Sequence, residues 1–591
     1  MEEYELYERA EPNLSGFERD LYDAVSADEP WSLVERFADL ERVSGSDEEK
    51  EAAEYIADRL DAFDVPYDRH DPNIWLSIPE DATLRATTPV EKKFDAVKTV
   101  SFSKSGSTSG EVVHIDPPEM NEGRLALNAS FDDLDEDIAG KIVLVEANYL
   151  SREMIADIED RDAEAIIGIQ LHEEEPHEGI ATPVWGAVPH PDHQDRVPDI
   201  IITNVSKTVG DELRDLAEEG LEVTVSADAP KKWAECPVIV ARIPGEADPD
   251  NDDFALLHGH YDSWWYGVTD NATGDAGMLE LARVFNERRD ELKRDLWVAW
   301  WPAHSTGRYG GSTWFATEFA LEMDDRCVAQ VNMDSPGAKD ATEFQDNVSW
   351  MAAGDDLCQT AIDDVCGKSA QSNRLHRAGD ASFNNLGVTG LFMLSSNIPT
   401  EVREARGYHP VGGSGGNSNA WHLSTDTLDK ADPDVLVRDI RVYGTVLSRL
   451  LREEVVPLDF SHSVEGHRET IAEYQELAGE HFDLSPIADT LADLEDALDD
   501  FDDAVDAGEI STAAANETLK RVQRHLVRVN YVSEGKFEQD PALNRPPYPK
   551  LAPAAELPDR SGDEYQFLKV HLDRARNSVE HELEQALEEL E

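Results

Sequence analysis

Histidine and aspartate residues in the segment HGHYDSWWYGVTDNATG, residues 258–274, are spaced in a way that suits metal binding. His260 and Asp262 lie two residues apart at the end of a predicted strand, so their side chains leave the same face. A carboxylate beside an imidazole typically orients that ring toward a metal. Asp270 lies in a turn before the next predicted helix, where its two oxygens could bridge two ions. His258 would share the face of His260 and is therefore a rival ligand.

Two distant segments add one more aspartate and one more histidine. Asp334 ends a predicted strand in VNMDS, and His422 lies in the polar loop WHLSTDT. Active sites of open α/β sheets gather at the carboxyl ends of strands, so His260, Asp270, Asp334 and His422 are expected to converge. Two imidazoles and two carboxylates suit Zn²⁺, and suit Mn²⁺ or Co²⁺ less well. The alternative interpretation is four unrelated surface polar residues.

The elements that must position these residues alternate between strands and helices. Apolar runs predict strands at residues 237–243, 254–260, 296–301, 328–333 and 388–394. An amphipathic helix is predicted over residues 274–289, between the second and third strands. This alternation predicts an α/β fold, with a mixed sheet flanked by helices. Residues 31–70 are predicted to be helical and contain a capping-box pattern at Ser46–Glu49.

The remaining segments differ in character from this α/β pattern. Residues 75–230 alternate short apolar runs with polar turns, which predicts a β-rich inserted domain. Residues 457–591 read as long helices, which predicts a helical bundle used for packing or dimerisation. The α/β domain is therefore expected to consist of residues 30–74 and 231–456.

The composition excludes several classes of partner. The chain has 125 acidic and 52 basic residues, a formal net charge of −73, and only 17 of the basic residues are lysine. Such a surface repels nucleic acids and anionic membranes, and is typical of halophilic proteins that stay hydrated in molar salt. Four cysteines without a CxxC motif are not a disulfide framework. The absence of a leader-like segment and of long apolar runs predicts a cytoplasmic protein.

The motifs together resemble the co-catalytic zinc aminopeptidases and their glutamate-carboxypeptidase-like relatives. The matching segments, in order, are GHYDS, DNATG followed by MLELARVF, VNMDS, GDASF and WHLSTDTLDK. The resemblance implies one or two zinc ions held by His260, Asp270, Asp334 and His422. It also implies that Asp270 bridges both ions, that Asp262 orients His260, and that the peptide after Asp270 is cis.

The resemblance extends to the flanking segments. Residues 75–230 resemble the protease-associated domain of the carboxypeptidase-like branch, through EDIAGKIVLVEAN and TPVWGAVP. The last 130 or so residues resemble the helical dimerisation domain found in that branch and in the transferrin receptor. The resemblance therefore implies a homodimer.

One departure from this family concerns its Glu-Glu pair, which supplies a general base and a zinc ligand after the strand that here reads DLWVAWWPAH. Aligning on Gly307 puts His304 and Ser305 at the pair, whereas aligning on Gly311 puts Ser305 and Thr306 there. Both glutamates are absent in either case. An imidazole can ligate zinc or carry a proton near neutral pH, so His304 is a candidate for either catalytic role.

Three further residues are candidates for substrate binding. Arg308 and Tyr309 follow the altered pair and could hold a carboxylate or an oxyanion, and Tyr408 precedes His422. We interpret the chain as a metal-dependent hydrolase of small peptides or amides, of the exopeptidase type. The alternative is a catalytically inactive homologue that serves in binding or assembly. An amide-forming or cyclising enzyme is a third hypothesis.

Overall fold

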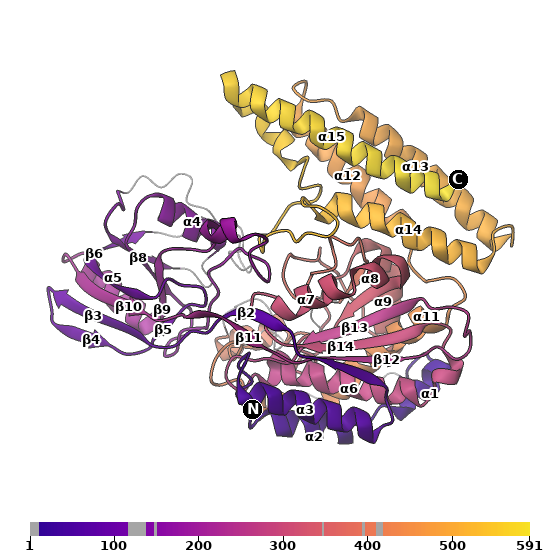
Figure 1. Cartoon of the computed structure of the whole chain (residues 1–591), viewed down its shortest axis with the longest axis horizontal. Helices are drawn as coiled ribbons and strands as arrows, with labels where there is room; N and C mark the ends of the chain where they lie inside the picture. The colour runs from indigo at the N-terminus through magenta and orange to yellow at the C-terminus, as the bar shows by residue number, and fades with distance from the viewer. Residues whose placement is uncertain (1–10, 116–136, 147–150, 346–347, 393–395, 409–417) are drawn as a thin grey trace.

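The structure is a computed structural model that describes residues 11–115, 137–146, 151–345, 348–392, 396–408 and 418–591. Figure 1 shows a helix-covered sheet, a second sheet in purple to one side, and long orange and yellow helices above the first sheet. The predicted fold class is confirmed: an α/β region with a mixed sheet flanked by helices, a β-rich insert and a C-terminal helical region.

The sheet of the α/β region has six strands in the order β1-β12-β14-β13-β15-β16. All neighbours pair in parallel except that β12 runs antiparallel to both β1 and β14. The strands are β1 Tyr67–His70, β12 Val238–Ile243, β14 Asp295–Trp301, β13 Phe254–His260, β15 Cys327–Asn332 and β16 Gly390–Leu391. Because β13 and β15 are parallel neighbours, the residues that follow them meet at one edge of the sheet.

Helices cover both faces of this sheet, which explains why its central strands are largely apolar. In β13, Ala255 and Leu257 pack into one core cluster, whereas Phe254 and Leu256 pack into another with Phe315. A strand buried on both faces needs no polar alternation. The first face carries α1 Gly16–Ala24, α2 Asp28–Phe37, α3 Asp47–Ala62, α6 Thr273–Asn286, α9 Asp355–Cys366 and α11 Pro433–Arg452; the second carries α7 Gly310–Glu318 and α8 Ala320–Arg326.

Two predictions about these elements need correction. Residues 67–70 are not helical but form β1, because the helical spacing of apolar residues ends at Phe63 and the backbone then pairs with the free edge of β12. The strand predicted over residues 388–394 is limited to Gly390–Leu391, and residues 393–395 lie outside the described part of the chain. The N-cap predicted at Ser46 is confirmed, since Ser46 Oγ accepts a 3.0 Å hydrogen bond from the Glu49 N–H. The second bond of the capping box is shifted by one residue, because Glu49 Oε2 accepts from the Gly45 N–H at 2.8 Å rather than from the Ser46 N–H.

The insert is an eight-stranded sheet in the order β4-β3-β10-β6-β7-β8-β9-β5. Its elements are β3 Ala82–Thr88, β4 Lys92–Phe94, β5 Val97–Thr99, β6 Gly106–Ile115, β7 Ile142–Glu146, β8 Ala165–Ile169, β9 Ile201–Val205, β10 Glu222–Ala227, α4 Arg152–Asp160 and α5 Lys207–Ala217. The chain enters and leaves this sheet through β2 Asn73–Ser77 and β11 Lys231–Glu235, which pair with each other in antiparallel fashion.

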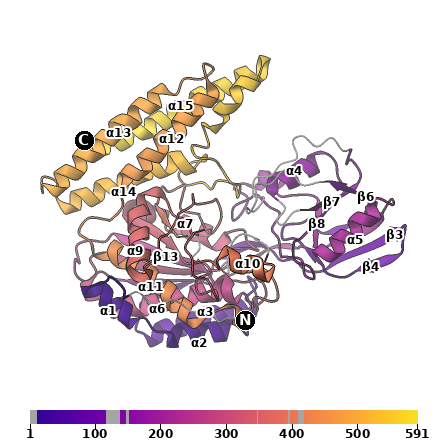
Figure 2. The same ribbon diagram turned by 180° about the vertical axis from the view of Figure 1, so that it is seen from behind.

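The C-terminal helices lie on the α/β region, as Figure 2 shows from behind. Helix α14 makes the contact through buried polar groups: Lys520 Nζ lies 2.5 Å from an oxygen of Asp253, and Gln523 donates to the Val328 carbonyl at 3.1 Å. These bonds fix the bundle to the sheet that carries the candidate site. The helices are α12 Phe460–Ala478, α13 Ser485–Asp506, α14 Thr512–Tyr531 and α15 Gly562–Leu590.

Among the described residues, none of the helices combines the length and the apolar character needed to cross a bilayer.

Candidate metal centre

Two histidines and two aspartates, far apart in the sequence, meet in one buried group that we call the His–Asp cluster: His260, Asp270, Asp334 and His422. His260 Nε2 lies 3.2 Å from Asp270 Oδ1 and 3.7 Å from Asp334 Oδ2. The other oxygen of Asp270 lies 3.3 Å from His422 Nε2. Asp270 therefore stands between the two imidazoles, with one oxygen facing each ring.

The donor atoms of this cluster fit a divalent metal ion. His260 Nε2 is buried and forms no hydrogen bond of acceptable geometry with a described residue, although two carboxylates lie near it. A buried polar nitrogen without a partner is costly, and a cation among these carboxylates would remove that cost. The mixture of nitrogen and oxygen donors matches the ligands that Zn²⁺ takes in proteins.

The charges within the cluster support each other. Burial alone would lower the pKa of His260, but the nearby carboxylates of Asp262, Asp270 and Asp334 outweigh it and raise that pKa well above its ordinary value. Burial would raise the pKa of Asp270, but His260 and His422 hold it well below its ordinary value. The carboxylates thus favour a positive charge at this position, as they would favour a metal ion.

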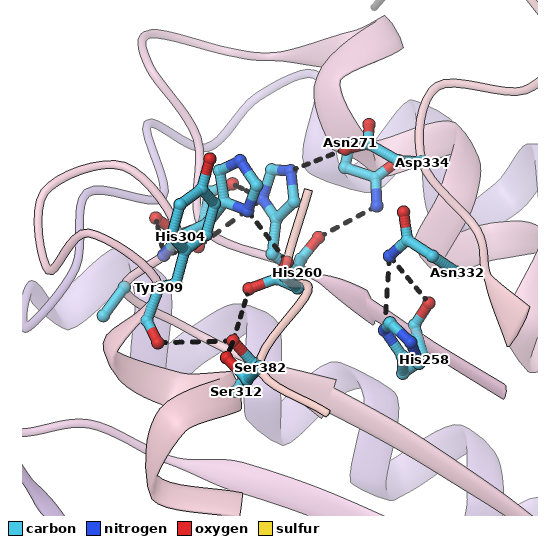
Figure 3. Close-up of polar contacts among 12 residues, drawn as sticks. His258, His260, Asn271, His304, Tyr309, Ser312, Asn332, Asp334 and Ser382 are labelled. Atoms are coloured by element: carbon cyan, nitrogen blue, oxygen red, sulfur yellow. Dashed lines mark hydrogen bonds and ion pairs between the residues drawn. The ribbon is translucent and has the colours of Figure 1, made fainter. Parts of the chain in front are cut away.

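The Asn271 side chain connects the backbone segments that carry three of these residues. Its amide nitrogen donates to the carbonyls of His260 at 3.1 Å and Met333 at 3.0 Å, and its oxygen accepts from the Ser335 N–H at 2.9 Å. Figure 3 shows Asn271 between His260 and Asp334. The Asp270–Asn271 peptide is cis, as the family resemblance implied.

Asp262 contributes to the site in two ways. The carbonyl of Asp262 lies 3.0 Å from His260 Nδ1, while its carboxylate is 3.5 Å away, so the backbone makes the closer contact with the ring. The carboxylate instead accepts from the His304 N–H, with both oxygens at 3.1 Å, and from Ser44 Oγ at 3.1 Å. Asp262 therefore ties the His260 strand to the altered segment after β14.

His258 takes no part in the cluster. Its ring is fully buried and pairs with Gln330 Oε1 at 2.5 Å and with Asn332 Nδ2 at 3.2 Å. Trp301 stacks on it at 4.8 Å between ring centroids. These contacts occupy both ring nitrogens of His258, and none of those found in the described residues is with a side chain of the His–Asp cluster.

His304 is the residue of the altered segment that lies against the cluster. Its ring stacks on the ring of His260, with centroids 3.9 Å apart and an angle of 19° between the planes. Donor atoms of His260, His304 and Asp334 all lie within 4.8 Å of one another. Ser305, the neighbour of His304, is also buried and accepts from the Arg308 N–H at 3.1 Å through its carbonyl.

The substrate-binding candidates lie in two places. Arg308 and Tyr309 are both buried, with Tyr309 between the edge of the His304 ring and Trp185 of the insert, which stacks on it at 4.0 Å. Tyr408 instead packs against a small apolar cluster that includes Ala338. None of the contacts found for Tyr408 within the described ranges is with the His–Asp cluster.

Several residues around the cluster were not singled out from the sequence. Asp426 accepts from the Thr269 N–H and hydroxyl, next to Asp270, and burial raises its pKa to about 7. The sequence signal that could have identified Asp426 is its position four residues after His422, inside the same motif. Arg42 is fully buried and binds the loop after His260, and it had no motif to mark it.

The insert also reaches the site. Glu178 accepts from Trp265 Nε1 at 3.2 Å, and Glu175 accepts from Ser424 Oγ at 2.7 Å. Lys98 pairs with both glutamates, at 2.8 Å and 2.9 Å. The insert thus holds the loops on either side of the cluster, a role that only long-range contacts could reveal.

The part of the chain that carries this cluster matches a known family. Residues 238–445 match the model for peptidase family M28. We refer to this matched segment as the M28 domain. All four residues of the His–Asp cluster, together with His304 and Arg308, lie within it.

Two known proteins are similar to part of the chain. The probable glutamate carboxypeptidase LAMP1 of Arabidopsis thaliana is 26% identical over 276 residues, which cover 42% of this chain and 37% of the relative. The aminopeptidase NAALADL1 of Mus musculus is 32% identical over 130 residues, or 21% of this chain and 17% of the relative. The chain therefore matches well under half of the length of either relative.

Solved structures of an aminopeptidase and of a peptidase M28 precursor share the fold of much of the chain. An aminopeptidase from Aneurinibacillus sp. strain AM-1 superposes with a TM-score of 0.54 and 20% identity, over 74% of this chain and 96% of that one. A peptidase M28 precursor from Shewanella amazonensis gives a TM-score of 0.56 and 16% identity, over 74% and 96% of the two chains. At these sequence identities, the similarity shows a shared fold and nothing about the reaction.

Proposed function

We propose that the chain is a metal-dependent hydrolase of peptide or amide bonds that acts as an exopeptidase on small substrates. The observation that carries the proposal is the meeting of two imidazoles and two carboxylates, each at most 7% exposed, within an M28 domain. Relatives named as an aminopeptidase and a glutamate carboxypeptidase support the same class of reaction.

The residues of the His–Asp cluster would hold zinc, as one or two ions. Bound zinc supplies Lewis-acid polarisation of the scissile carbonyl and activation of water. Asp262 keeps the His260 ring in place through the 3.0 Å contact with its carbonyl. His304, whose ring lies on that of His260, completes the catalytic group that we propose in place of an acidic pair.

This assignment is tested on the full chain in molar KCl, where salt screens the self-repulsion of its acidic surface. We expect about one or two zinc ions per chain by atomic spectroscopy, and hydrolysis of aminoacyl amides or acyl dipeptides. Removal of zinc by a chelator should lower turnover at least about 1,000-fold, because several kcal/mol of transition-state stabilisation are lost. Added zinc should restore it.

Two other results would contradict this proposal. A chain that binds no metal even when zinc is supplied would contradict the metal centre. A chain that binds zinc stoichiometrically and hydrolyses neither substrate class would instead favour an inactive homologue used in binding or assembly.

Arg308 is proposed to bind a carboxylate of the substrate. It is 4% exposed, its guanidinium lies 4.4 Å over the ring of Tyr309, and its Nε has no hydrogen-bond partner in the described residues. None of the ion pairs found in the described part of the chain involves it, although the protein is strongly acidic. Arg377 is stacked 3.8 Å over Trp185 on the far side of the same aromatic pair and makes the position more positive. A buried guanidinium without an acidic partner favours an anionic ligand.

Replacing Arg308 by methionine is expected to raise KM about 10- to 100-fold for peptides with a free C-terminal carboxylate, since a hydrogen bond to a charged group contributes about 1.5–3 kcal/mol. The same peptides with a C-terminal amide should show little change. Steady-state kinetics on this substrate pair measure the difference, and Arg308→Lys serves as the charge-preserving control. Equal losses on both substrates would contradict carboxylate binding.

Two finer parts of the proposal concern Tyr408 and assembly. Tyr408 is proposed as a substrate contact because it precedes the segment that carries His422, and its burial is only partial. A homodimer is proposed through the helical region. The exposed side chains of Phe567 and Val570, one helical turn apart on α15, support this mode of association.

A further inference from the structure

The side chain of His304 is fixed from two directions, more firmly than simple packing requires. Its backbone N–H donates to both oxygens of Asp262 at 3.1 Å. Its ring lies between the face of His260, at 3.9 Å, and the ring of Tyr309, whose centroid is 4.9 Å away in an edge-on arrangement. Figure 3 shows His304 in this position beside His260. The imidazole therefore has little freedom to turn away from the His–Asp cluster.

Asp380 determines which ring nitrogen of His304 is available. Its Oδ2 lies 2.8 Å from His304 Nδ1, and its Oδ1 accepts from Ser312 Oγ at 2.7 Å. Asp380 is fully buried, and Ser312 in turn lies 2.9 Å from Ser382 Oγ, which accepts from Trp185 Nε1. A carboxylate that accepts from Nδ1 fixes the tautomer with its lone pair on Nε2.

The Nε2 atom of His304 has no hydrogen bond within the described ranges, and donor atoms of His260, His304 and Asp334 lie within 4.8 Å of one another. Within the cluster, His422 Nε2 instead lies beside the second oxygen of Asp270, at 3.3 Å. An imidazole held by a carboxylate on one nitrogen, with the other facing a ligand group, is the usual arrangement of a metal-bound histidine.

We propose that His304 is itself a metal ligand, through Nε2, at the position shared with His260 and Asp334, and that Asp380 is the residue that positions it. This inference rests on the proposed function, because it assumes that a metal binds at the His–Asp cluster. It goes further in giving the altered segment a direct part in the metal centre. The ligand set then contains three imidazoles, from His260, His304 and His422.

The test measures metal binding rather than turnover alone. Zinc affinity is determined by competition with a chelator, and Co²⁺ is added to the metal-free full chain to record its visible absorption. We expect His304→Ala to lower zinc affinity at least about tenfold and to change the cobalt spectrum, because one ligand is replaced. Turnover should fall at least about tenfold as well, as expected for loss of a catalytic group.

Variants of Asp380 separate positioning from packing. Asp380→Ala is expected to lower zinc affinity about 10- to 100-fold, whereas Asp380→Asn should recover part of it, because its amide oxygen can still accept from Nδ1. Ser448→Ala is the control, because Ser448 is buried within α11, donates to the Thr445 carbonyl at 2.9 Å and should leave both metal readouts unchanged. His304→Gln, which keeps size and polarity, replaces His304→Ala if the latter does not fold.

The outcomes distinguish this inference from the proposed function. A wild-type chain that binds neither zinc nor cobalt would contradict the proposed function itself. Wild-type binding together with unchanged affinity and an unchanged cobalt spectrum in a folded His304 variant would overturn the ligand role alone. Equal losses in Asp380→Ala and Asp380→Asn, with no change in cobalt coordination, would overturn the positioning role.

Discussion

Replacing Asp270 by alanine is expected to reduce bound zinc to a small fraction of the wild-type content and to lower turnover at least about 1,000-fold. One oxygen of Asp270 lies 3.2 Å from His260 and the other 3.3 Å from His422, so its loss disconnects the two imidazoles. The loss of several kcal/mol of transition-state stabilisation corresponds to that factor. Metal analysis after dialysis, followed by kinetics in molar KCl, measures both effects.

The control for this variant is Asp253→Asn. Asp253 directly precedes the opposite end of β13, is also buried, and pairs with Lys520 rather than with a histidine. Its replacement changes a buried carboxylate without touching the His–Asp cluster, so zinc content should stay near the wild-type value. Full zinc content in Asp270→Ala would rule out Asp270 as a ligand.

Replacing Arg42 by methionine is expected to lower the free energy of unfolding by about 4 kcal/mol, because several buried carbonyls lose their donor at once. Arg42 is fully buried. It donates to the carbonyls of Tyr261 at 2.7 Å, Tyr266 at 2.7 Å and Gly267 at 3.0 Å, and to two carbonyls near the end of α2. The loop that it holds connects His260 to Asp270, so zinc affinity should also fall, by about 10- to 100-fold.

Urea unfolding followed by tryptophan fluorescence, in molar KCl, measures the loss of stability. Arg19→Met is the matched control, since Arg19 is exposed and forms a surface pair with Asp23 at 3.1 Å. Such a pair contributes at most about 1 kcal/mol. A loss in Arg42→Met no larger than in this control would mean that the loop is held by other contacts.

Much of the α/β fold could be predicted from the sequence because its core strands are largely apolar and its helices are amphipathic. The strand predicted over residues 254–260 matches β13, and the helix predicted over 274–289 corresponds to α6 at Thr273–Asn286. Both signals arise from local burial patterns. The edge strand β1 was missed because its four residues are only half-buried and depend on pairing with β12.

Gly259 in β13 is required for a reason that the sequence alone does not show. A Cβ atom at Gly259 would lie 2.8 Å from the Met333 carbonyl and 2.9 Å from Met278 Sδ. The residue after β15 and helix α6 therefore lie too close to Gly259 for a side chain at that position. The reason for this glycine becomes visible when its neighbours from other segments are in place.

The sequence by itself determined the types of residue available for chemistry and their order along the chain: His260, Asp270, Asp334 and His422, with His304 as a candidate in the segment where the resemblance implies an acidic pair. Residue type and local spacing are sufficient for this, since ligand chemistry and strand periodicity are local properties. The tertiary structure alone decided that the ring of His304 lies on that of His260 and that Asp380, 76 residues away, binds its other side. Contacts at such separations depend on how the sheet, the loops and the insert pack together, and the local sequence does not specify that packing.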